Sequence, residues 1–140
     1  PPTSFCPRGR PAARAFRQQS LAYYRQAALA RPTSPFAALA VASLKLKLGE
    51  VDREFSFFLG RGFDSGPWEP RVQLFAINLG LAAWQALPEA QRQQVRLAVN
   101  RQMLWQQFNQ SAAILAVLKE FGRMDLLDAA AAKAAGLKRD

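Results

Sequence analysis

The chain has few side chains suited to acid–base or nucleophilic chemistry. Histidine is absent from all 140 residues, which excludes Ser-His-Asp and Cys-His catalysis and imidazole metal sites. The one close group of carboxylates is Glu50, Asp52 and Glu54, whereas a glycosidase needs two carboxylates that face one bond. Glu50 and Asp52 are placed as charges at the start of a helix, and Arg53 and Lys47 lie near Glu54 in the sequence. We therefore predict that the protein is not an enzyme.

Motifs for phosphates, metals and cofactors are not found in the sequence. The segment Gly60-Arg-Gly-Phe-Asp-Ser-Gly lacks the lysine–hydroxyl pair of a phosphate-binding loop, and no strand precedes it, so we interpret it as a linker. The single cysteine, Cys6, cannot form an internal disulfide or a thiolate cluster. We expect neither a metal ion nor a cofactor.

A stripe of polar residues is the best candidate for a binding site. Arg71, Asn78 and Gln85 recur every seven residues on a helix that is otherwise apolar, and Arg92 and Arg96 lie one turn apart on the next helix. The planar guanidinium of arginine holds a carboxylate with two hydrogen bonds. These five residues predict a shallow groove that binds a carboxylate of a partner; a solvated polar edge is the alternative.

The charge is strongly basic and concentrated near the N-terminus. Lysine and arginine number 19 against 10 acidic residues, for a formal charge of +9. Six arginines precede the first acidic residue: Arg8, Arg10, Arg14, Arg17, Arg25 and Arg31. Such a patch attracts acidic polymers, anionic lipids and nucleic acid. Nucleic acid is disfavoured because no stacking segment or helix-turn-helix signature accompanies the arginines, and a solvated basic face remains the simpler interpretation.

Apolar periodicity, prolines and glycines predict an all-α chain of one domain. Residues 1–11 hold four prolines and a glycine and form a predicted leader, followed by a helical domain over 12–136 and a tail over 137–140. The seven expected helices cover residues 12–30, 35–48, 51–63, 69–87, 88–108, 110–121 and 124–135.

Gly80 and the tryptophans predict where helices meet. A glycine inside a helix costs about 1 kcal/mol, so we expect another helix backbone to approach Gly80. Trp68 is expected to fold back against the helix that follows it, while Trp84 and Trp105 are expected in the core or between helices.

The turns at Pro32 and Pro67 lie 35 residues apart, a period typical of stacked helical hairpins. Several residues at these spacings resemble the tetratricopeptide repeat: Ser20, Tyr24, Ala27 and Pro32 in one repeat, then Ala42, Gly49, Asp52, Phe58 and Pro67 in the next. Three positions depart from that pattern, because Ala38 replaces its tryptophan, Lys45 its tyrosine and Glu54 its small residue. The resemblance implies a tetratricopeptide-like α-α superhelix of antiparallel hairpins.

Five runs within residues 20–128 carry a more particular resemblance: Arg31-Pro-Thr-Ser-Pro-Phe-Ala, Leu48-Gly-Glu-Val-Asp-Arg-Glu-Phe, Gly66-Pro-Trp-Glu-Pro-Arg-Val-Gln-Leu, Gly80-Leu-Ala-Ala-Trp-Gln-Ala-Leu-Pro and Phe121-Gly-Arg-Met-Asp-Leu-Leu. They resemble small, membrane-anchored tetratricopeptide-like proteins encoded among bacterial exopolysaccharide biosynthesis genes. This resemblance implies an inner-membrane anchor upstream, a periplasmic domain and a scaffold role in polysaccharide assembly or export.

The expected function is that of a non-catalytic scaffold whose concave groove binds a peptide or helix of another protein, a component of the polysaccharide machinery. The alternative is a basic module that binds an acidic polysaccharide or nucleic acid through its arginine-rich first helix. No run of 18 apolar residues is present. The expected location is the periplasmic side of the inner membrane if an anchor precedes the chain, and the cytoplasm otherwise.

Overall fold

The computed structural model describes residues 11–104 and 110–137 and confirms the all-α class. Its helices are α1 (Pro11–Ala30), α2 (Pro35–Lys47), α3 (Arg53–Ser65), α4 (Pro70–Ala82), α5 (Glu89–Leu104), α6 (Ser111–Phe121) and α7 (Ala129–Ala134). Within the described residues, two short 3₁₀ turns accompany them, η2 (Trp84–Ala86) and η4 (Met124–Leu126). No strand occurs within the described ranges. Most of the expected leader and tail, Trp105 and the expected end of the fifth helix lie outside them.

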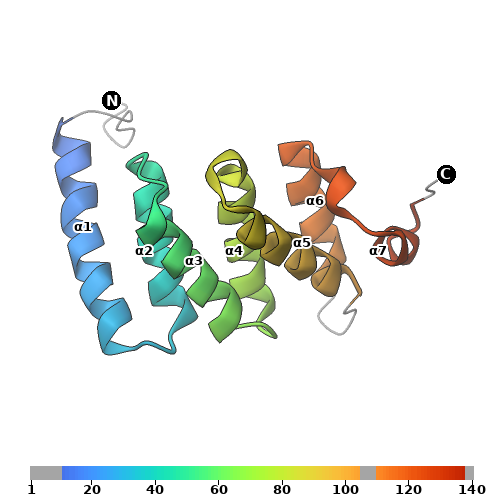
Figure 1. Ribbon diagram of the computed structural model, residues 1–140, viewed down its shortest axis with the longest axis horizontal. Helices are drawn as coiled ribbons and strands as arrows, with labels where there is room; N and C mark the ends of the chain where they lie inside the picture. Colours follow the sequence, from blue (N-terminus) through green and yellow to red (C-terminus); the bar gives the residue numbers. More distant parts are fainter. Residues whose placement is uncertain (1–10, 105–109, 138–140) are drawn as a thin grey trace, which may run out of the picture.

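The helices stand side by side in a row that begins at α1 and ends at α7 (Figure 1). The principal packing contacts join each helix to the next one or two along the chain, as α2 contacts α1, α3 and α4. The buried apolar residues accordingly form one continuous cluster, from Leu21 of α1 to Ala132 of α7. Each described helix therefore packs mainly on its neighbours in sequence.

Short polar side chains cap the starts of α2 and α3. The Ser34 hydroxyl accepts a hydrogen bond from the backbone N–H of Ala37, and the Asp52 carboxylate accepts one from Phe55 at 3.1 Å. Gly122, with φ +66°, ends α6 in the left-handed conformation that glycine adopts without strain. These local signals explain why the sequence places the α1–α2, α2–α3 and α6 boundaries to within a few residues.

Two helix boundaries differ from the sequence-based prediction. The fourth helix ends at Ala82 rather than at residue 87. Residues 84–86 form η2 instead, and Leu87, which precedes Pro88, takes an extended conformation (φ −77°, ψ 142°). The seventh helix begins at Ala129 rather than at residue 124, because Asp128 caps a new helix there. The segment from Gly60 to Gly66 is not a linker, since α3 continues through Ser65.

Two glycines allow helices to pack closely. A Cβ atom on Gly62 of α3 would lie 2.6 Å from Cγ of Leu39 in α2, and one on Gly80 of α4 would lie 2.6 Å from Cγ2 of Val95 in α5. The expected close approach at Gly80 is therefore made by a side chain of α5 and not by its backbone. Among the described helices, none is long and apolar enough to cross a membrane.

Candidate interaction surfaces

The predicted polar stripe does not form one line. Arg71 is exposed in the first turn of α4, and the amide of Asn78 donates a hydrogen bond to the Leu74 carbonyl of its own helix at 3.0 Å. Gln85 lies beyond the end of α4, in η2. A spacing of seven residues forms one line only if the helix continues to residue 87. Because α4 ends at Ala82, Gln85 does not lie on the line of Arg71 and Asn78.

Arg92 closes the turn between α4 and α5. Its Nε and Nη2 atoms donate hydrogen bonds to the carbonyl oxygens of Trp84 and Gln85, both at 3.0 Å. Its guanidinium also lies 5.6 Å from the centre of the Trp84 ring. Trp84 is thus an inter-helix contact, and two of the five N–H donors of Arg92 are used within the chain.

Arg123 packs on the same tryptophan from the segment just before η4. Its guanidinium lies 4.3 Å from the Trp84 ring centre and donates two hydrogen bonds to Asp125, at 2.9 and 3.0 Å. Those hydrogen bonds, with a smaller contribution from the charge of Arg96, hold the pKa of Asp125 below its usual value. The structure therefore brings Arg92 to Gln85 at the start of α5, whereas Arg96 lies one turn further along α5 and donates a hydrogen bond to Gln93 at 3.4 Å.

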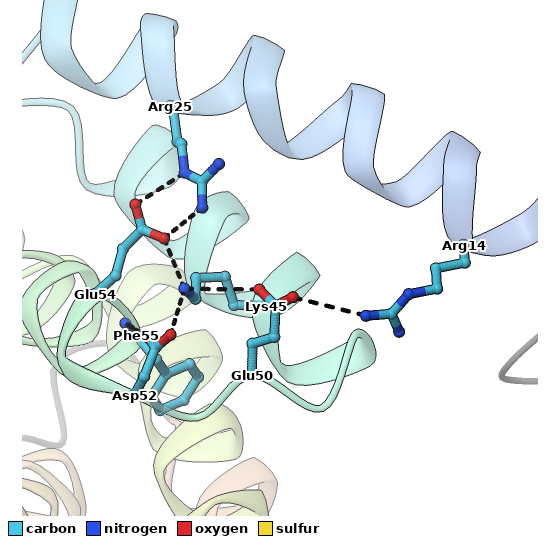
Figure 2. A network of polar contacts seen from close by, with 7 residues as sticks. All are labelled: Arg14, Arg25, Lys45, Glu50, Asp52, Glu54 and Phe55. Carbon is cyan, nitrogen blue, oxygen red and sulfur yellow. Dashed lines mark hydrogen bonds and ion pairs between the residues drawn. The ribbon is translucent and has the colours of Figure 1, made fainter.

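A network of charges joins α1, α2 and α3 (Figure 2). The Lys45 side chain is 3% exposed, and its ammonium lies 2.6 Å from Glu54, 2.8 Å from Asp52 and 3.8 Å from Glu50. Arg25 of α1 donates two hydrogen bonds to Glu54, at 2.8 and 2.6 Å. The carboxylates that the sequence presents as helix-start charges therefore hold three helices together.

The sequence does not predict this network, because Arg25 lies 29 residues from Glu54 and because Lys47 and Arg53 are nearer to Glu54 in the chain than Lys45 is. Glu54 is paired with Lys45 and Arg25, not with the neighbouring Lys47 and Arg53. A signal is nevertheless present: Lys45 and Glu54 are two of the three departures from the repeat pattern, and they carry opposite charges. Two residues of opposite charge that both depart from the repeat pattern predict a contact with each other, which neither of them predicts alone.

The same network reduces the free charge of the first helix. Arg25 pairs with Glu54, and Arg14 lies 3.8 Å from Glu50. Of the arginines of α1, these two face the acids of the α2–α3 hairpin, so less of the positive charge is available to an acidic polymer than the sequence suggests. Arg17 and Arg31 are the remaining described arginines of this segment, and neither has an ion pair with a described acid.

The network makes stability depend on pH. Hydrogen bonds from Arg25 lower the pKa of Glu54, and those from Lys45 lower the pKa of Asp52. Burial alone would lower the pKa of Lys45, but its hydrogen bonds to Asp52 and Glu54 raise it overall. The lowered carboxyl pKa values stabilise the fold above about pH 5 and lose this effect as the pH falls through the folded values. The raised lysine pKa stabilises it below about pH 10 and loses the effect as the pH rises through the folded value.

We predict that acidification from pH 7 to pH 3 lowers the urea midpoint of the wild type more than that of Glu54→Gln. The reason is that the glutamine variant has already lost the largest of the carboxylate interactions. Urea unfolding followed by circular dichroism at pH 7, 5, 4 and 3 measures the difference. Parallel curves for the two proteins would show that Glu54 contributes nothing to the acid dependence.

A groove runs between α3 and α5. The Gln91 amide of α5 donates a hydrogen bond to the Ser56 carbonyl of α3 at 2.8 Å, and the Gln94 amide donates one to Asp64 at 3.1 Å. Two hollows of about 440 and 370 Å³ lie along these contacts, and Gln94 and Leu97 line both of them. Leu97 is 67% exposed although it stands in the groove between two packed helices. We refer to this surface as the α3–α5 groove.

Trp68 and Arg101 stand at one end of this groove. Trp68 is 60% exposed, so most of its side chain is open to solvent. The Arg101 guanidinium lies 5.7 Å from its ring centre, and Arg101 donates a hydrogen bond to Gln73 at 3.1 Å. Gln73 is fully buried and donates in turn to the Gly66 carbonyl at 2.8 Å. The turn before α4 and the end of α5 are thereby locked together.

Comparison with known proteins identifies no relative: no family model, no curated protein and no solved structure matches the chain. The tetratricopeptide and exopolysaccharide resemblances therefore stay predictions from the sequence.

Proposed function

We propose that this protein is a non-catalytic interaction scaffold that binds an extended segment of another protein in the α3–α5 groove. The observation that supports this most is Leu97, a large apolar side chain left 67% exposed between two hollows. Exposed apolar residues that line a hollow with a few polar groups are typical of binding sites. Trp68 and Arg101 add an aromatic surface and a cation at one end.

The groove has the length and chemistry for a short peptide. Gln91 and Arg101 are ten residues apart on α5, so the groove spans about 15 Å, the length of four or five extended residues. An apolar side chain of the peptide would pack on Leu97, and a carboxylate would approach the guanidinium of Arg101, which lines the second hollow. Arginine is well suited to that contact because its guanidinium can donate two hydrogen bonds to one carboxylate.

Peptide display tests this function, because a random library offers the groove many sequences at once. We expect selection on the folded protein to enrich short peptides with an apolar residue and a carboxylate. Leu97→Asp should weaken a selected peptide at least tenfold in fluorescence anisotropy. The substitution removes the apolar contact, and its negative charge repels the carboxylate of the peptide. Leu29→Asp is the matched control, since Leu29 is 68% exposed on α1, and it should bind as the wild type does. Equal affinities of all three proteins would refute the groove.

The biological setting rests on the sequence resemblance alone. We propose that the partner is another component of an exopolysaccharide assembly or export machine, acting on the periplasmic side of the inner membrane. Deletion of the gene should lower the secreted polysaccharide, and a gene copy with Leu97→Asp should fail to restore it. If the Leu97→Asp copy restores the secreted polysaccharide to the wild-type level, the role in polysaccharide secretion does not depend on the α3–α5 groove.

A further inference from the structure

We propose that α1 carries a second docking surface, separate from the α3–α5 groove, which binds an acidic amphipathic helix of a partner protein. The surface is an apolar stripe of Ala12, Phe16, Tyr23 and Ala30, which we call the α1 stripe. These residues share one side of the helix because they are separated by four or seven positions.

The two aromatic side chains of the α1 stripe are largely exposed. Helix α1 lies at one end of the described row (Figure 1). On it, Phe16 is 70% exposed and Tyr23 68% exposed. Seven residues separate them, which places the two rings about 10.5 Å apart along the helix. This spacing matches apolar anchors two turns apart, at positions i and i+7, on a facing helix.

Two hollows lie along the stripe, and each contains an arginine. The first, of about 330 Å³, is lined by Ala12, Ala13, Phe16 and Arg17. The second, of about 430 Å³, is lined by Tyr23, Gln26, Ala27, Ala30 and Arg31 of the first helix and the residue after it, with Ser34 and Ala37 at the start of α2. Hollows at both ends of the stripe give room for apolar side chains of a docked helix.

The positive charge of this surface favours a partner helix that carries carboxylates. No aspartate or glutamate occurs between residues 11 and 31, and Arg14 and Arg25 are engaged by Glu50 and Glu54. Arg17 and Arg31 remain beside the two hollows, 14 positions apart, or about 21 Å along the helix direction. A helix with carboxylates at both ends of an apolar stripe would meet both arginines, which gives favourable contacts at each end.

The same charges disfavour a second copy of this chain as the occupant. A symmetric antiparallel contact centred on Tyr24, midway between the two arginines, would set Arg17 of one copy against Arg31 of the other. Like charges at these two places oppose association, and α1 has no acid to compensate them. An acidic helix removes this repulsion, so the charge pattern points to a different protein.

The test uses two designed peptides of about 18 residues, five turns of amphipathic helix. Both carry leucines at positions that match the α1 stripe, and one has glutamates near its two ends where the other has lysines. We expect the glutamate peptide to bind the full chain at least tenfold more tightly than the lysine peptide in fluorescence anisotropy. Tyr23→Ser should weaken the glutamate peptide at least tenfold, while Leu97→Asp in the α3–α5 groove should leave it unchanged.

Charge-reversal variants test whether Arg17 and Arg31 cause the preference for the glutamate peptide. The double variant Arg17→Glu/Arg31→Glu should prefer the lysine peptide, provided that its circular dichroism and urea midpoint match the wild type. Arg17→Gln/Arg31→Gln, which keeps the polar bulk, should lose the preference between the two peptides. Equal binding of both peptides by the wild type, or an unchanged preference in the reversed variant, would overturn the proposal. A dimer in sedimentation equilibrium that Tyr23→Ser abolishes would also overturn it, because a second copy would then occupy the stripe.

Discussion

Replacing Lys45 with methionine should lower the free energy of unfolding by about 3 kcal/mol, the lower end of the range for breaking a buried ion pair. The substitution keeps the length and most of the volume of the side chain but removes the ammonium that lies within 2.8 Å of both Asp52 and Glu54. Both carboxylates would then repel each other beside a buried apolar group. Water reaches them in part, since the Glu54 side chain is 32% and the Asp52 side chain 53% exposed, and this limits the loss. Urea unfolding at pH 7 measures it.

Two further variants show whether the network causes the effect. Lys47→Met removes an exposed lysine two residues later on α2 and should change stability by no more than about 0.5 kcal/mol. Lys45→Tyr/Glu54→Ala supplies the residue types of the repeat pattern at both positions and should be more stable than Lys45→Tyr alone, because no carboxylate pair is left without its cation. If Lys45→Met and Lys47→Met cost the same, the network does not stabilise the fold.

Replacing Gly62 with alanine should destabilise the fold by about 2 kcal/mol, as overpacking of a close helix contact typically does. The new methyl group would overlap the side chain of Leu39, which is fully buried and cannot move into solvent. Helix α3 would have to shift away from α2, disturbing the most extensive helix pair of the fold. Thermal or urea unfolding of the variant measures the loss.

Gly60 provides a matched control on the same helix. Its added Cβ would lie 3.6 Å from the Gln91 amide, an ordinary van der Waals distance. Gly60→Ala should therefore stabilise the protein, by up to about 1 kcal/mol, because alanine favours helix over glycine. A stabilising Gly62→Ala, or equal losses at both positions, would show that α2 and α3 do not pack as described.

The fold could be predicted because its signals are local. Helix starts at Ser34 and Asp52 and a helix end at Gly122 depend on residues within a few positions of each boundary. The end of α4 is harder to predict despite Pro88, because the apolar residues up to Leu87 continue the helical spacing after the backbone has left the helix. Periodicity alone cannot distinguish a buried turn from another turn of helix.

The candidate surfaces depend on contacts between distant residues, and the sequence predicts these poorly. Arg92 has the residue type and spacing of a binding arginine, yet it donates to the backbone of the preceding turn. Leu97 carries no signal in the sequence, because nothing in its neighbourhood along the chain distinguishes it from a buried leucine, and its 67% exposure is evident only from the structure. The arginine excess near the N-terminus is evident, but its partial neutralisation requires the positions of Glu50 and Glu54.

Amide hydrogen exchange is the most direct test of the scaffold function, measured with and without a peptide selected on the folded protein. Binding in the α3–α5 groove predicts slower exchange across residues 56–64 and 90–101, and unchanged exchange in α6 and α7. Slower exchange confined to other helices would contradict the account, and so would the failure of every selected peptide to bind better than its scrambled version.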